Sequence, residues 1–217
     1  MKNVTLKKLC IAAAFLAAFA LWTGATCLID VQEIGPHGTS VGFATVNGCF
    51  HKLTGVHMAL YTLTDWLSLV PIALVLCFAL LGAAQWVWRK RFFAVDYSIL
   101  VLGGFYLVVA AAYVLFEICA INYRPVLIEG ALEASYPSST TVLVMCVMPT
   151  AMLQLRTRIA KRTPRRLVNG LLGLFTVFMV FARVLSGVHW LSDIIGGALL
   201  SAGLVMMYDF ISSLKHK

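Results

Sequence analysis

Arg183, His189 and Asp193 are the residues of this chain whose types and spacing most clearly suggest chemistry. They lie at the junction between two long apolar segments, where charged side chains are costly. His189 and Asp193 are four residues apart, so on one helix face the carboxylate can hold one imidazole nitrogen and leave the other as a nucleophile. Arg183 would point about 120° away on that helix. We therefore expect a helix end at Arg183, a break at Ser186-Gly187, and a new helix presenting His189 and Asp193.

The composition predicts an integral membrane protein that holds these residues on transmembrane helices. Of 217 residues, 61% are hydrophobic and 12% are charged, and the mean hydropathy is +0.90. We expect an all-α, polytopic protein of one domain over residues 1–217, with its core at 30–213. A kink is expected at Pro71 in the second helix. The six apolar segments long enough to span a bilayer are 8–28, 60–88, 97–119, 139–155, 166–185 and 191–213.

The basic residues predict the orientation of these helices. All of them except Lys52, Arg124 and Arg183 precede the first helix or follow the second, fourth and sixth helices. By the positive-inside rule both termini are cytoplasmic, in a bacterial plasma membrane, and the three exceptions face outward. The net charge of +8 is explained by orientation and by attraction to anionic lipid, so we expect no nucleic-acid partner.

Two features of the chain leave alternatives open. The Lys7-Lys8 pair and the apolar run after it could also be a cleaved signal peptide, which would leave the later helices in the same direction. The six cysteines show no metal-ligand spacing, so we expect no metal site and no cofactor. A disulfide among Cys27, Cys49 and Cys119 is an alternative to free thiols.

Two outer loops lead into candidate binding residues. Residues 29–56 predict a loop with a short interfacial helix, and residues 121–137 form a second loop that ends at Pro137. Pro137 followed by Ser138 and Ser139 indicates a helix N-terminus, whose free backbone N–H groups bind anions. With Arg124 from the second loop, these groups could hold the oxygens of a phosphoryl group while His189 attacks it.

These three pieces resemble the motifs of the type 2 phosphatidic-acid phosphatase superfamily, which shares its fold with the vanadium haloperoxidases. The family motifs Lys-x6-Arg-Pro, Pro-Ser-Gly-His and Ser-Arg-x5-His-x3-Asp are matched, in this order, by the segments 117–125, 137–140 and 182–193. The resemblance implies a six-helix bundle and a membrane lipid phosphatase. It also implies that His189 is the nucleophile, that Asp193 orients it, and that Arg124, Ser138, Ser139 and Arg183 bind phosphate.

Four positions depart from the family pattern: Ser139 replaces its glycine, Ala182 replaces its third-motif serine, and two other replacements remove a group with a chemical role. Glu117 stands where the family has the lysine, and Thr140 stands where it has the histidine that protonates the leaving oxygen. Loss of a general acid affects a lipid alkoxide more than a departing phosphate, so the sequence favours a prenyl or lipid pyrophosphate, such as undecaprenyl pyrophosphate, as substrate. Glu117, His51 and His57 are candidates to replace the acid.

Other interpretations of these residues remain open. Glu117 could instead pair with Arg124 or Arg183. Independently, we expect Glu129 and Glu133 to form a solvated face of their loop. A catalytically silent protein that binds or moves lipid phosphates is the main alternative function. A vanadate-binding, haloperoxidase-like protein is a further alternative. The expected partners are membrane lipids and a lipid phosphate or prenyl pyrophosphate substrate.

Overall fold

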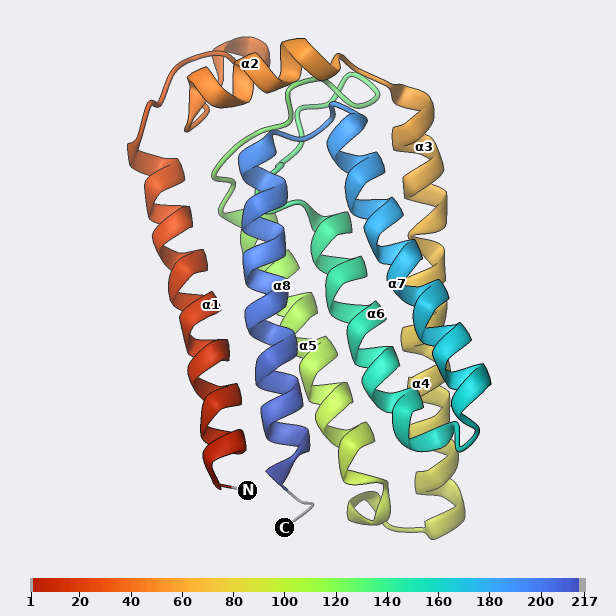
Figure 1. Cartoon of the computed structure of the whole chain (residues 1–217). Helices are drawn as coiled ribbons and strands as arrows, with labels where there is room; N and C mark the ends of the chain where they lie inside the picture. The colour runs from red at the N-terminus through yellow and green to blue at the C-terminus, as the bar shows by residue number, and fades with distance from the viewer. Residues whose placement is uncertain (1, 215–217) are drawn as a thin grey trace.

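The computed structural model describes residues 2–214, which form an all-α bundle (Figure 1). Short 3-10 turns occupy Pro36–Gly38 and Phe92–Ala94. Six helical stretches are long and apolar enough to cross a membrane, which confirms the number and approximate positions of the predicted segments. The helices are α1 (Lys2–Leu28), α2 (Ala44–Thr54), α3 (Met58–Leu67), α4 (Leu69–Arg89), α5 (Tyr97–Ile118), α6 (Ser139–Arg158), α7 (Arg162–Leu185) and α8 (Leu191–Ser212).

The second transmembrane segment is divided into α3 and α4 at Ser68. Pro71 has no backbone N–H with which to bond the carbonyl of Leu67, so the helical ladder is interrupted just before it. At the interruption the Ser68 hydroxyl donates to the carbonyl of Thr64 at 2.8 Å. The helix is therefore interrupted three residues before Pro71, while the kink itself stays a prediction. The two halves follow one another along one side of the bundle (Figure 1).

Helix α6 lies at the centre of the bundle and packs against α4, α5, α7 and α8. Its predicted end at residue 155 was too early, because the helix continues to Arg158. The outer helices carry exposed apolar side chains, as expected where the neighbour is lipid rather than water. All six cysteines are free, so no disulfide joins Cys27, Cys49 and Cys119.

Helix α1 packs along α8 and is part of the bundle. Trp22 donates its indole N–H to the carbonyl of Ser192 at 3.0 Å, and Lys8 pairs with Asp209 at 2.8 Å near the other end. The short helix α2, predicted within the loop 29–56, is also tied to the start of α8. Its buried Asn47 donates to the Ser192 hydroxyl at 2.9 Å and accepts the Ser192 backbone N–H at 3.1 Å.

The two ends of the bundle differ in composition. Helix α2 and the loops before α6 and α8 cover one end, whereas α1 begins and α8 ends at the opposite end (Figure 1). The junctions between α4 and α5 and between α6 and α7, which carry most of the basic residues, also lie at that opposite end. Lys215 and Lys217, which contributed to the predicted orientation, lie outside the described residues.

Candidate phosphoryl-transfer site

The turn between α7 and α8 places Arg183 and His189 side by side at the covered end of the bundle. Helix α7 ends at Leu185, and the predicted break at Ser186-Gly187 is present. Gly187 has a φ of 67°, and a Cβ atom there would lie 1.9 Å from the carbonyl oxygen of Gly55, so only glycine fits. Helix α8 begins at Leu191, so the prediction that His189 and Asp193 share a helix face was wrong.

Ser135 joins His189 to Asp193, a role that the sequence did not reveal. The ring Nδ1 of His189 lies 3.9 Å from the Asp193 carboxylate, beyond hydrogen-bond distance, but 3.0 Å from the Ser135 hydroxyl and 3.2 Å from its carbonyl oxygen. The Ser135 hydroxyl in turn donates to the Asp193 carboxylate at 2.5 Å. The carboxylate therefore orients His189 through a serine rather than directly.

These contacts determine which nitrogen of His189 carries the proton. A backbone carbonyl only accepts hydrogen bonds, so Nδ1 must be the protonated nitrogen that donates to Ser135. The other nitrogen, Nε2, then has a free lone pair. It is buried and has no hydrogen-bond partner among the residues that the structure describes. A neutral imidazole with a free, oriented Nε2 is the form required of a nucleophile.

Asp193 is fully buried and is held from several sides. Asn122 donates its side-chain N–H to the carboxylate at 2.9 Å, and the backbone N–H of Trp190 donates at 3.0 Å. The loop that precedes α6 supplies both Asn122 and Ser135, because its two arms pair through the Ser135 N–H and the Asn122 carbonyl at 2.8 Å. The sequence did offer one signal for these contacts, because Asn122 and Ser135 are polar residues near the two ends of the same loop.

Arg183 is 1% exposed and enters the site from α7. One of its terminal nitrogens donates to the hydroxyl of Thr140 and lies 3.7 Å from the carboxylate of Asp65. Its Nε and other terminal nitrogen are buried without a hydrogen-bond partner among the described residues. Unmet donors on a buried guanidinium mark a place that an anion such as phosphate would fill.

Arg124 approaches Arg183 across the ring of Tyr61 on α3. The ring centre lies 4.9 Å from the Arg183 guanidinium carbon and 5.5 Å from that of Arg124. Arg124 also forms an ion pair with Glu133 at 3.0 Å, but its Nε makes no hydrogen bond with the described residues. The structure thus brings the two predicted arginines together and adds Tyr61, which the sequence did not single out.

The start of α6 is anchored to α8. The N–H of Ser138, the N-cap residue, donates to the carbonyl of Asp193 at 3.1 Å, and its hydroxyl accepts from Thr141 at 3.1 Å. The N–H groups of the first turn, which begins at Ser139, have no intrahelical acceptor. The predicted helix start is confirmed, whereas phosphate binding by Ser138 and Ser139 stays a prediction.

The acidic residues near the site differ from the expected pairing. Arg124 pairs with Glu133, so Glu133 is not simply part of a solvated face. Arg183 lies near Asp65, a residue that the sequence analysis passed over. Among the described residues, no basic side chain lies within ion-pair distance of Glu117, so the pairing of Glu117 with Arg124 or Arg183 was wrong.

The two histidines considered as replacement acids hold the neighbouring turns. The Nε2 atom of His51 lies 3.1 Å from the carbonyl oxygen of Gly187, and that of His57 lies 2.9 Å from the carbonyl oxygen of Thr54. The backbone N–H of His57 also donates to Ser186 at 2.9 Å. The His51 ring and the His57 backbone thus contact the loop that carries His189, whereas the His57 ring bonds within its own turn. No cluster of potential metal ligands occurs in the described part of the chain.

The pKa of His189 lies well below its usual 6.5, chiefly because burial disfavours the charged ring and also because Arg124 and Arg183 repel a proton. A lowered pKa means that the lone pair of Nε2 stays available as the pH falls. We expect the acid limb of kcat/KM to lie below about pH 6.5, measured with the titration of the substrate phosphate determined separately. An acid limb at or above this pH would contradict a neutral, buried nucleophile.

Comparisons with known proteins support the fold. No protein-family profile matches the chain, and no curated protein sequence matches it. The structure is similar to the crystal structure of the first transmembrane PAP2 type phosphatidylglycerolphosphate phosphatase from Bacillus subtilis. The two chains are 18% identical, the TM-score is 0.64, and the match covers 95% of this chain and 98% of the other. The chain therefore has the fold of a transmembrane type 2 phosphatidic-acid phosphatase.

Proposed function

We propose that this protein is a membrane lipid phosphatase that hydrolyses a lipid or prenyl phosphate or pyrophosphate through a phosphohistidine at His189. The observation that carries the proposal is the arrangement of unmet groups: the free Nε2 of His189 lies in a buried cluster with unmet N–H donors of Arg124 and Arg183. The nucleophile and the anion-binding groups are thus positioned together before substrate binds, as phosphoryl transfer requires. The likeness of fold agrees with this chemistry.

The proposed reaction has two steps. Nε2 of His189 attacks phosphorus, and the bond from phosphorus to the lipid oxygen, or to the bridging oxygen of a pyrophosphate, breaks with its electron pair on that oxygen. A departing alkoxide then takes a proton from water. Arg124 and Arg183 hold the remaining phosphoryl oxygens, and Asp193 stabilises the charged ring through Ser135. Water then attacks phosphorus and loses a proton to solvent, and the phosphorus–nitrogen bond breaks with its electron pair on Nε2, so phosphate leaves and neutral His189 is restored.

The proposed orientation places this site at the outer leaflet. The basic residues gather at the end of the bundle opposite to His189, and the positive-inside rule assigns that end to the cytoplasm. Substrate phosphate would then be released outside. A reporter fused after the C-terminus should report a cytoplasmic location, and a reporter active only outside the cytoplasm would contradict the orientation.

One observation favours the catalytically silent alternative. Thr140, at the position of the family's second-motif histidine, uses its hydroxyl to hold Arg183 and has no acidic proton of comparable strength to give. Purified protein in detergent should release phosphate from at least one of phosphatidic acid, farnesyl pyrophosphate and undecaprenyl pyrophosphate. Binding of these lipids without release of phosphate from any of them would establish the silent alternative.

Replacing Thr140 with histidine should raise the rate on lipid monoesters at least about tenfold and change the rate on pyrophosphates less. The reason is that imidazole can protonate a departing alkoxide, whereas a departing phosphate hardly needs a proton. Thr140→Ser is the matched control, because it keeps the hydroxyl that holds Arg183. If a folded Thr140→His protein shows both rates unchanged, the argument from the leaving group is wrong, and the pyrophosphate preference falls with it.

A further inference from the structure

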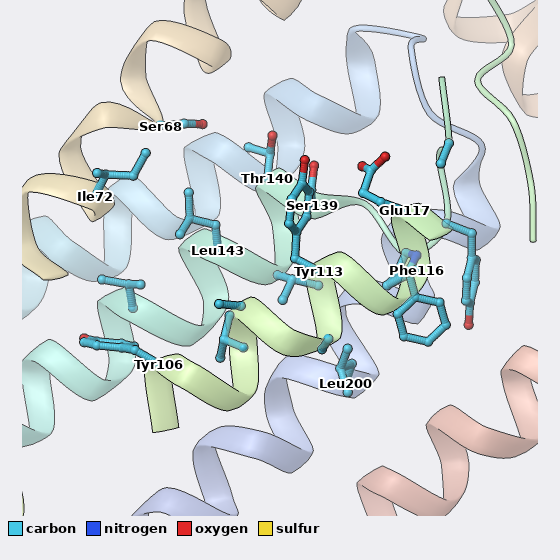
Figure 2. Close-up of a pocket in the computed structure, with 18 of the residues that line it drawn as sticks. Ser68, Ile72, Tyr106, Tyr113, Phe116, Glu117, Ser139, Thr140, Leu143 and Leu200 are labelled. Atoms are coloured by element: carbon cyan, nitrogen blue, oxygen red, sulfur yellow. The ribbon is translucent and has the colours of Figure 1, made fainter. Parts of the chain in front are cut away.

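A cavity of about 470 Å³ lies beside the proposed phosphoryl-transfer site, between α4, α5 and α6 (Figure 2). At one end it is lined by Ser135 and Thr140, which contact His189 and Arg183 respectively. Much of the remaining wall is apolar, with residues such as Ile72, Val109, Leu143, Val147 and Leu200. The cavity therefore adjoins the phosphate-binding groups and provides an apolar space for the part of a lipid next to its phosphate.

The charge of this cavity is unusual for a site that would accept an anionic lipid. The charged side chains in its wall are Asp65 and Glu117, and neither lysine nor arginine lines it. Asp65 lies 3.7 Å from Arg183, so a cation already offsets its charge. No basic side chain of the described residues lies within ion-pair distance of Glu117. Glu117 is thus the negative charge of the cavity that lacks an adjacent cation.

Glu117 lies at the end of the cavity where the reaction would occur. In Figure 2 it is at the same end as Ser139 and Thr140, whereas Tyr106 is at the other. Tyr113, one helical turn earlier on α5, contacts the Glu117 carboxylate with its hydroxyl. Glu117 is itself exposed. A carboxylate at this position beside apolar walls would attract a cation on the substrate and repel an anion.

We infer that this cavity selects lipid phosphates that carry an ammonium group close to the phosphate, with Glu117 as the residue that binds the ammonium. The inference rests on the proposed function and specifies its substrate class. An ammonium group beside the leaving oxygen also stabilises the negative charge that builds up there, which suits a site with threonine in place of the family's proton donor. Glu117 acts here as a specificity residue that contacts the substrate.

The test compares two phosphates that differ in one group. One is hexadecyl phosphate, and the other carries an amino group on the carbon next to the phosphate-bearing carbon; its N-acetylated form controls for size. We expect kcat/KM for the amino phosphate to exceed that for hexadecyl phosphate by about tenfold or more. Glu117→Gln should reduce this ratio several-fold and leave only the part that the ammonium contributes at the leaving oxygen, because glutamine keeps the shape of glutamate without its charge. Glu129→Gln, in the exposed loop before α6, should keep the full ratio.

The possible outcomes distinguish a failure of the ammonium preference from a failure of the phosphatase proposal. Equal rates on both phosphates in the unaltered protein would overturn the ammonium preference and leave the phosphatase proposal standing. An unchanged ratio in Glu117→Gln, with both rates lowered together, would contradict the binding role and indicate a general acid or a structural residue. Failure to release phosphate from any of the phosphates or pyrophosphates tested would contradict the phosphatase proposal itself. Thermal unfolding of the variants identifies any that fail to fold.

Discussion

Replacing His189 with alanine should lower phosphate release from lipid phosphates and pyrophosphates alike by at least about 10⁴-fold. The substitution removes the Nε2 atom that attacks phosphorus, so no property of the leaving group can compensate for it. Lipid binding should persist, because the unmet donors of Arg124 and Arg183 remain in place. Phosphate release and equilibrium binding of the same lipid, measured on one preparation, would show this separation.

The control for this substitution is His37→Asn. His37 is exposed in the loop between α1 and α2 and has a φ of 56°, a backbone conformation that asparagine tolerates well. This variant should retain full activity. Substantial residual turnover by a pure, folded His189→Ala protein would show that another group carries out the attack.

Replacing Ser135 with alanine should reduce kcat by about ten- to a hundredfold while changing KM much less. The Ser135 hydroxyl contacts His189 and Asp193 and has no contact with Arg124 or Arg183, so its loss affects the nucleophile rather than phosphate binding. The Ser135 carbonyl still accepts from Nδ1, which is why some activity should remain. Steady-state kinetics on one lipid phosphate would measure the two effects.

Ser201→Ala is the matched control for Ser135→Ala. Ser201 is also buried, on α8, and its hydroxyl donates to the backbone carbonyl of Gly197 at 2.7 Å and contacts the thiol of Cys146. Its loss should leave kcat unchanged within about twofold. Ser135→Thr, which keeps a hydroxyl, should recover part of the activity. An equal fall in kcat for both alanine variants would indicate a general effect of removing a buried hydroxyl.

The transmembrane segments and the motif order could be predicted because each depends on local sequence. A bilayer requires long apolar helices, so composition alone locates the spans, and Pro71 identifies the interrupted one. The break after Arg183 followed from its angle relative to His189 and from Gly187. These features need no knowledge of which segments lie side by side.

The parts of the site that could not be predicted depend on contacts between segments that are distant in the sequence. Ser135 reaches Asp193 only because the loop before α6 folds over the start of α8, and spacing within one segment cannot show this. For the same reason the sequence suggested a direct contact between His189 and Asp193 where a serine lies between them. Asp65 did offer a signal, since a carboxylate within a transmembrane segment suggests a functional role.

The most direct test of the central claim is to trap the phosphorylated enzyme. The purified protein is mixed with a lipid phosphate or pyrophosphate that carries ³²P in the phosphoryl group to be transferred, and the reaction is stopped in alkali and the labelled peptide mapped. The account predicts a label that is stable in alkali, is lost in acid and lies on His189, with no label on His189→Ala. Turnover with a covalent label on another residue, or a label that His189→Ala retains, would contradict it.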